Sequence, residues 1–185
     1  MEVSIRVFCW MLCGALTCTV QARAQGQALV KSARDFVQEF YAWYVPRALK
    51  AHEGPAWDLA LEYKAHAFSP ELLRALKADS DAQAKVSGEI VGLDFDPFLN
   101  TQDPCERYEC GTVAKKGGEY WINVYGICSG KRSETPDVVV ELMPRGDGWE
   151  FVNFHYENLI KDHPASADLL AILRLLRRDR RESRK

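Results

Sequence analysis

The sequence predicts an α+β domain in which helices from the amino-terminal half pack on a curved, cone-like antiparallel sheet, followed by a helix at the carboxyl end. Three observations support this fold class. Apolar residues recur at helical spacing before about residue 80, they alternate with polar residues after it, and glycine-rich turns separate the alternating segments. Helices first and then a run of strands are typical of α+β domains.

The first 24 residues have the features of a secretory signal peptide. Arg6 is followed by an apolar run over residues 7–20, and Ala22-Arg23-Ala24 forms a small-x-small cleavage motif. The apolar run is about fourteen residues long, which is short for a helix that crosses a bilayer. We therefore expect cleavage after Ala24 and a periplasmic or secreted protein.

The mature chain has the length of one domain. Of the 185 residues, 161 remain after the signal peptide, and we expect a single domain over residues 25–164 and an amphipathic helix with a basic tail over residues 165–185. Residues 25–173 carry 15 basic and 23 acidic side chains, a net charge of −8. A nucleic-acid-binding protein needs a basic face, so this class is excluded. The tail from Arg177 to Lys185 could make weak contact with an anionic membrane surface.

Three helices are expected in the first half of the mature chain. Residues 28–50 predict an amphipathic helix, because apolar residues recur there every three or four positions. Pro46 should kink or end this helix, since proline has no amide hydrogen. Residues 57–63 predict two further turns. Ser69, followed by a proline, is typical of a helix start, and the third helix should run over residues 70–78.

The second half of the chain predicts strands and then a last helix. Turns at residues 116–119 and 145–148 contain glycine, which tolerates the positive φ that hairpins need, so the later strands should form an antiparallel meander. A leucine-rich helix should follow over residues 165–181. The five strands are expected over residues 86–93, 108–114, 120–127, 138–143 and 149–156. Strict alternation in the last strand places Val152, Phe154 and Tyr156 on one face and Phe151, Asn153 and His155 on the other.

The mature chain keeps three cysteines, Cys105, Cys110 and Cys128. With a two-residue turn in the first hairpin, Cys128 faces Arg107 and shares a side of the sheet with Cys105, whereas Cys110 faces Tyr125 on the other side. We expect a disulfide between Cys105 and Cys128, which closes a loop of about 22 residues and stabilises the chain by roughly 3 kcal/mol. Cys110 should be a buried free thiol. A catalytic or zinc-binding cysteine is poorly supported, because no Cys-x-x-Cys spacing occurs.

The stretch GLDFDPFLNTQDPC, residues 92–105, holds three aspartates and an asparagine among aromatic residues. Its side-chain oxygens could bind calcium, although the stretch lacks the glycine and terminal glutamate of an EF-hand loop. If Asp94 and Asp96 share a face at a strand end, one pKa could be raised and the pair could act as an acid-base catalyst. The favoured interpretation is structural. Asp96 and Asp103, each followed by proline, would cap turns, neighbouring aromatic residues would pack on the core, and the disulfide would hold the exit.

Two other groups are candidates for function. In an open cone, His155 could transfer a proton together with Glu157 or Asp94, although a lone histidine in a strand is usually structural. Lys131 and Arg132, in the segment CSGKRSETPD, could receive an anion, although ordinary solvation is the commoner role of such residues.

The segments GLDFDPFLNTQDPC, YWINVYGICSGKR, PDVVVELM and GWEFVNFHYEN resemble the bacterial domain-of-unknown-function family numbered 3828. The resemblance covers residues 36–158, and its most specific part is the aspartate-rich stretch together with YGICSGKR. It implies a small exported protein with a cone similar to that of nuclear transport factor 2, and it carries over no catalytic residue, ligand or cofactor. Cys110 and the arginine-rich end depart from the family pattern.

We therefore expect an exported binding or interaction module, without cofactor or metal, that recognises an unidentified protein or small ligand. One alternative is a small-molecule enzyme of the cone fold that uses Asp94, Asp96 or His155 as base. Another is an immunity or inhibitor protein that caps a secreted enzyme with an acidic loop. A filled cone would favour the binding module, and a cavity lined by two of these side chains would favour the enzyme. The candidate binding residues are Asp94, Asp96, Asp103, Lys131, Arg132 and His155.

Overall fold

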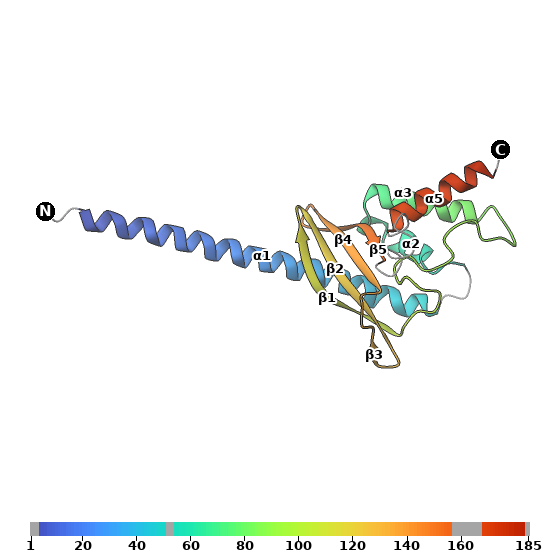
Figure 1. Ribbon diagram of the computed structural model, residues 1–185, viewed down its shortest axis with the longest axis horizontal. Helices are drawn as coiled ribbons and strands as arrows, with labels where there is room; N and C mark the ends of the chain where they lie inside the picture. Colours follow the sequence, from blue (N-terminus) through green and yellow to red (C-terminus); the bar gives the residue numbers. More distant parts are fainter. Residues whose placement is uncertain (1–3, 51–53, 157–167, 184–185) are drawn as a thin grey trace.

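The computed structural model describes residues 4–50, 54–156 and 168–183, and for residues 4–24 it describes the backbone alone. Helices at the amino end, an antiparallel sheet of five strands and a carboxyl-terminal helix form the predicted α+β arrangement (Figure 1). The helices are α1 (Ser4–Ala48), α2 (Asp58–Tyr63), the 3-10 turn η1 (Ala65–Ala67), α3 (Pro70–Gln83) and α5 (Leu169–Glu182). The strands are β1 (Arg107–Lys116), β2 (Glu119–Cys128), β3 (Lys131–Arg132), β4 (Val138–Arg145) and β5 (Gly148–His155).

The sheet is the predicted meander, in the order β1-β2-β4-β5, with the short β3 paired to β2. Both predicted hairpin turns are present, between β1 and β2 and between β4 and β5. Gly117 has φ +62° and Gly146 has φ +58°, a conformation that glycine adopts without a Cβ clash. The four strands predicted beyond residue 107 are thus confirmed.

The strand predicted over residues 86–93 is wrong. This segment is irregular and has no ladder partner in the described part of the chain. Gly88 has φ +83°, and Ile90 is 71% exposed, so the alternating pattern does not correspond to a buried sheet face. Side chains of α3 take the place of a neighbouring strand as partners of this backbone. Gln83 accepts hydrogen bonds from the amides of Val91 and Gly92.

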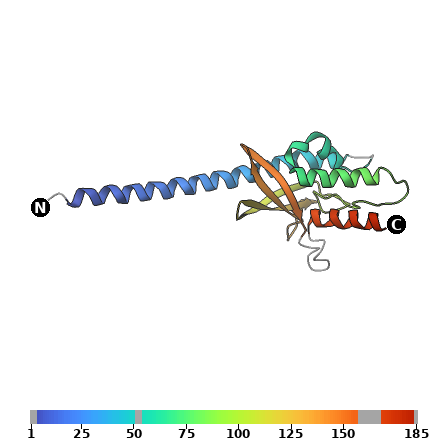
Figure 2. The ribbon, with the colours of Figure 1, turned by 90° about the horizontal axis from the view of Figure 1, so that it is seen from above.

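Helix α1 is longer than predicted, because it begins at Ser4 and includes the predicted signal segment. Pro46 lies in its last turn and the helix ends at Ala48, so the expected effect of the proline is confirmed. Figures 1 and 2 show α1 passing along the sheet and extending far beyond it at the amino-terminal end. No helix in the described part of the chain is long and apolar enough to cross a membrane.

Aromatic rings fill the space between the sheet and the helices. Phe40 of α1 lies at the centre, with its ring centroid 4.8 Å from that of Phe151 and 5.5 Å from those of Phe98 and Tyr44. Phe98, Phe151 and Phe154 are completely buried. These side chains occupy the volume in which an open cone would hold its cavity.

A β-bulge in β5 corrects the predicted faces of this strand. Leu142 pairs with Phe151 and Glu141 pairs with Asn153, so Val152 is an extra residue. The extra residue places Phe151 on the same side as Phe154, and both face the core. Asn153 is therefore on the outer face, whereas strict alternation correctly separated His155 from Phe154.

A second bulge changes the predicted register of the first hairpin. Near the turn, Val113 pairs with Ile122 as predicted, but beyond the bulge Cys110 pairs with Val124 rather than Tyr125. Likewise, Arg107 pairs with Ile127 rather than Cys128. Gly111 lies in this bulge under the ring of Tyr125, where an added Cβ would come within 2.6 Å of the ring. A side chain at this position would have to push the tyrosine ring away from the backbone.

Helix α5 packs its leucines on the domain. Leu169 and Leu173 are buried in the same core as the sheet residues. Asp168 caps the helix by accepting a hydrogen bond of 2.9 Å from the amide of Ala171, and Asn153 of β5 donates to the same carboxylate. The predicted first turn, from residue 165, lies outside the described residues. The helix ends at Glu182, one residue beyond the predicted end.

Candidate binding groove

Asp96 organises the aspartate loop, which we define as residues 92–105. Its Oδ1 accepts hydrogen bonds from the amides of Phe98, at 2.9 Å, and Leu99, at 3.2 Å. Its amide donates to the carbonyl of Thr101 at 3.0 Å, which closes the turn. Phe98 and Leu99 are buried, so the capped turn presses two apolar side chains onto the core. This is the structural role that the sequence favoured for Asp96.

The other carboxylate oxygen of Asp96 points to α1. Tyr44, which is fully buried, donates its hydroxyl hydrogen to Oδ2 at 2.5 Å. Burial raises the pKa of Asp96 from 3.8 to about 6, although the hydrogen bonds from Tyr44, Phe98 and Leu99 oppose this shift. Burial and the neighbouring Asp96 also raise the pKa of Tyr44, so this phenol stays protonated. Asp96 is thus a titratable group whose oxygens are both engaged by the fold.

A groove of about 370 Å³ lies between the aspartate loop, the end of α1 and the irregular segment that precedes the loop. Its size is in the range of pockets that hold small molecules. Most of its lining is apolar, its polar groups are amides, one hydroxyl and two carboxylates, and no basic side chain is among the described lining residues. The lining comprises Ala48, Pro55, Ala56, Trp57, Gln83, Ile90, Leu93, Asp94, Phe95, Asp96, Thr101, Gln102 and Pro104.

Asp94 is the exposed carboxylate of the groove. Gln102 donates a hydrogen bond of 2.7 Å to the carbonyl of Asp94, which fixes the backbone at this point. The carboxylate itself has no hydrogen bond or ion pair to any side chain in the described ranges. Asp94 and Asp96 therefore do not form the predicted carboxylate pair, because Asp96 turns inward to Tyr44 while Asp94 stays at the surface.

Asp103 lies on the same loop but does not line the groove. It is exposed, and its turn is capped by the hydroxyl of Thr101, which accepts from the amide of Asp103 at 3.0 Å. The predicted turn is present, but threonine supplies the cap that we assigned to the aspartate side chain. Within the described residues, no three His, Cys, Asp or Glu side chains lie close enough together to hold a metal ion.

His155 lies on the outer face of the sheet, away from the filled interior. Its Nε2 is 2.7 Å from a carboxylate oxygen of Glu141, and its ring stacks on Trp121 with a centroid distance of 4.2 Å. The ammonium of Lys116 lies 3.7 Å from the centroid of the same indole. Neither predicted partner is thus confirmed, since the carboxylate beside His155 is Glu141, and Glu157 lies outside the described residues.

Lys131 and Arg132 form the short strand β3 and are exposed. The guanidinium carbon of Arg132 lies 3.6 Å from the ring centroid of Tyr125, which is a cation-π contact on the surface of the sheet. Arg132 is therefore partly engaged by an aromatic neighbour. Neither residue borders the groove beside the aspartate loop.

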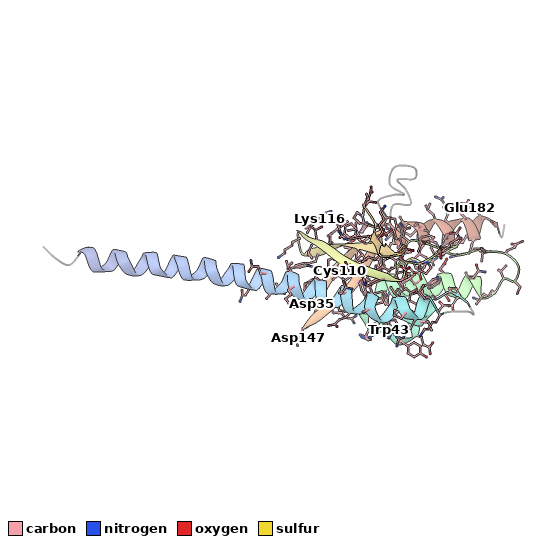
Figure 3. All side chains as sticks on the ribbon, turned by 90° about the horizontal axis from the view of Figure 1, so that it is seen from below. Asp35, Trp43, Cys110, Lys116, Asp147 and Glu182 are labelled. Atoms are coloured by element: carbon pink, nitrogen blue, oxygen red, sulfur yellow. A yellow bond between two sulfur atoms is a disulfide. The ribbon has the colours of Figure 1, made fainter. Side chains whose placement is uncertain are left out.

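The cysteines have the predicted roles. Cys105 and Cys128 form a disulfide with a Cα–Cα distance of 4.6 Å, and Cys110 is free and buried. Cys110 lies where β1 meets α1 (Figure 3), and its carbonyl accepts a hydrogen bond from Arg34. Burial raises the pKa of the Cys110 thiol to about 12, so the reactive thiolate form is suppressed.

The sequence did not indicate several residues that shape these sites. Trp57 and Gln83 line the groove, Tyr44 holds Asp96, and Glu141 pairs with His155. Trp57, Tyr44 and Glu141 were placed in predicted helices or strands without a role in a site, and Gln83 lay between two predicted elements. Only the spacing of Glu141 and His155 on neighbouring strands of a meander could have suggested a contact, and the bulge in β5 obscured it.

Comparison of the chain with protein-family models, with curated proteins and with solved structures found no match in any of the three. The resemblance to the 3828 family therefore stays a prediction. The function has to be inferred from the fold and from the geometry of the groove.

Proposed function

We propose that the protein is an exported binding module whose groove beside the aspartate loop holds a small ligand. The filled interior carries this proposal, because Phe40 and its neighbours occupy the inside of the domain, so that a ligand would bind at its edge, and the groove beside the aspartate loop has a mostly apolar lining there. In the cone fold that the sequence resembles, a chemical reaction would need an open interior. The packing thus favours binding over catalysis.

The lining suggests the chemical class of the ligand. Trp57, Leu93 and Phe95 offer apolar contact, and Asp94 adds a carboxylate without a partner among the described side chains. The surrounding body is acidic, with a net charge of −8 over residues 25–173. The matching ligand has a short apolar part that fills the groove and a cationic group that reaches Asp94.

Octylammonium and octanoate test this class, because they share a chain and differ in charge. Binding should change the fluorescence of Trp57, and the Trp57→Phe variant should lose most of this change. Octylammonium should bind more tightly than octanoate. Asp94→Asn should weaken octylammonium binding by about twofold to fivefold, the effect of an exposed ion pair.

The matched control is Asp103→Asn, which removes a carboxylate from the same loop at a position outside the groove. It should leave the affinity for octylammonium unchanged. Equal binding of the two probes, or equal losses in the Asp94 and Asp103 variants, would contradict a cation-selective groove.

The two alternative functions have less support. An acid-base enzyme would need its groups together, but Asp96 is engaged by Tyr44 and two amides while His155 lies on the outer sheet face. An inhibitor would need a protruding acidic loop. The aspartate loop is exposed at Asp94 and Asp103, but its aromatic residues and disulfide fasten it to the domain.

We also propose export by cleavage after Ala24 and membership of the 3828 family. The disulfide supports an oxidising compartment, since such bonds persist mainly outside the cytoplasm. The intact mass of the protein recovered from the periplasm or medium should correspond to a chain that starts at Gln25. A lipid-modified amino terminus, or a mass that includes residues 1–24, would contradict this proposal.

A further inference from the structure

One side of the groove is formed by an irregular segment, residues 89–93, which we call the wall segment and which includes the first two residues of the aspartate loop. Ile90 and Leu93 of this segment line the groove. Because the segment pairs with no strand in the described chain, its backbone depends on side chains for hydrogen-bond partners. Gln83 of α3 accepts from the amide of Val91 at 2.8 Å and donates to the carbonyl of Glu89 at 2.9 Å.

A second contact to the wall segment comes from α5, about 90 residues later in the chain. Arg180 donates one hydrogen bond of 2.7 Å to the carbonyl of Val91 and forms an ion pair of 2.5 Å with Asp79 of α3. Asp79 is 1% exposed, and its other oxygen accepts from the amide of Leu93 at 2.8 Å. Asp79 and Arg180 thus join α3, α5 and the wall segment in one buried network.

Gly92 shows how closely the wall segment approaches this network. A Cβ at position 92 would lie 2.6 Å from a carboxylate oxygen of Asp79, so any side chain there would displace the aspartate. A buried charge is tolerated only with full hydrogen bonding, which Arg180 and the amide of Leu93 supply. The position of the wall segment and the docking of Arg180 therefore depend on each other.

Helix α5 is held unevenly along its length. Its first turns are anchored by the buried Leu169 and Leu173 and by the Asp168 cap. In the last turns Arg177, Arg178 and Arg181 are exposed, and Arg180 turns inward. Figures 1 and 2 show this end of α5 beside α3. Because the buried leucines lie in the first turns, opening of the last turns would leave the core packed.

We propose that the end of α5 is a latch that positions the wall segment, so that latch docking and ligand binding in the groove are coupled. Arg180 is the positioning residue. It holds the wall segment in place and does not itself line the groove. Coupling between two sites is reciprocal in free energy. Release of the latch weakens binding in the groove, and an occupied groove holds the latch closed. The coupling rests on the proposed function, whereas the positioning of the wall segment by Arg180 does not.

Hydrogen exchange tests the latch without a ligand. In Arg180→Ala, the amides of Val91, Gly92 and Leu93 and those of the last turns of α5 should exchange at least about tenfold faster than in wild type, because a buried carboxylate loses its partner. Arg181→Ala is the matched control, since it removes the same charge from an exposed position one residue away. Unchanged protection of the wall segment in Arg180→Ala, or equal effects of both variants, would overturn the proposal.

Octylammonium binding tests the coupling. Arg180→Ala should bind it at least about fivefold more weakly, the lower end of usual coupling factors, while Arg181→Ala should bind it as wild type does. Saturating octylammonium should slow exchange at the end of α5 in wild type. If wild type binds octylammonium without protecting α5, the coupling is refuted. If wild type does not bind it, the proposed ligand class fails, and the ligand-free exchange experiment still decides whether Arg180 positions the wall segment.

Arg180→Lys covers the case in which the alanine variant does not fold. Lysine keeps the charge beside Asp79 but lacks the rigid planar guanidinium, whose Nη1 donates to both Asp79 and Val91. The wall segment should still exchange faster than in wild type, by a smaller factor than in the alanine variant. Wild-type exchange rates in Arg180→Lys would show that the bridge to Val91 is not needed.

Discussion

Replacing Asp96 by asparagine should change how the stability of the protein depends on pH. Burial raises the pKa of Asp96 from 3.8 to about 6 in the folded chain. A shift of about two units corresponds to about 3 kcal/mol of difference between the protonated and ionised forms. Asparagine has nearly the same shape, keeps an oxygen for the amides of Phe98 and Leu99, and presents its own amide to the Tyr44 hydroxyl. It removes the titration, and it also removes the acceptor of the Tyr44 hydroxyl hydrogen, a cost that does not change with pH.

Whether stability rises or falls with pH depends on which state, folded or unfolded, holds the proton of Asp96 more tightly. Between about pH 4 and pH 6 the folded chain keeps Asp96 protonated while the unfolded chain has released that proton. The contribution of Asp96 to the free energy of unfolding is therefore fully present below about pH 4 and is lost as the pH rises through about 6. At pH 7 the folded chain contains an ionised, buried carboxylate. Asp96→Asn avoids this cost.

Urea unfolding of both proteins at several pH values between 4 and 7.5 measures this effect. The free energy of unfolding of Asp96→Asn, relative to wild type, should rise by up to about 3 kcal/mol across this range. Asp103→Asn, an exposed aspartate on the same loop, should give a profile parallel to wild type. A constant difference between Asp96→Asn and wild type at all pH values would refute the raised pKa.

Three further predictions concern the disulfide, the core and the tail. Replacing Cys105 and Cys128 by serine should lower the free energy of unfolding by roughly 3 kcal/mol in urea titrations, and no loss would contradict the disulfide. Phe40→Ala should cost about 3–5 kcal/mol by the same measurement, whereas a loss below about 1 kcal/mol would mean that the interior is not filled. The bases of Arg177–Lys185 other than Arg180 should give weak sedimentation with anionic vesicles at low salt. Glutamine in place of these bases, Arg180 excepted, should abolish it, and sedimentation that survives the change would rule out this tail as the contact.

The fold was largely predictable where the determinants are local. Glycine at positive φ fixes the hairpin turn at Gly117, and a serine before proline starts α3 at Pro70 with the predicted cap, Ser69 accepting from the amide of Leu72. Bulges were not predictable, since they depend on a partner strand. At the bulge around Gly111, Tyr125 of the neighbouring strand packs on the backbone. The disulfide was still predicted correctly, because the bulge moves the pairing by one residue without separating the two sulfurs.

The candidate site was predictable only in part. The role of Asp96 as a turn cap can be derived from the residues beside it in sequence, and it is confirmed. The partner of its other oxygen, Tyr44, is more than 50 residues away on α1, where helical spacing indicated only a core residue. Arg180 was included in the basic tail that could contact an anionic membrane surface. In the structure it pairs instead with Asp79 on α3, which is buried at a depth where it needs a positive partner.

In the proposed binding function, the segments around the groove determine which sizes of ligand it accepts. The sheet is fixed by ladder hydrogen bonds and the interior by Phe40 and its neighbours, so a ligand cannot move either at low cost. The aspartate loop is fixed at one end by the Asp96 turn and at the other by the disulfide. The wall segment has neither strand-ladder hydrogen bonds in the described chain nor a disulfide. Its backbone is held by the side chains of Gln83, Asp79 and Arg180. A ligand too large for the groove must therefore displace this segment first and break the contact with α5. We infer that substitutions at Gln83 or Arg180 widen the range of ligand sizes, whereas substitutions in the sheet lower stability and leave this range unchanged.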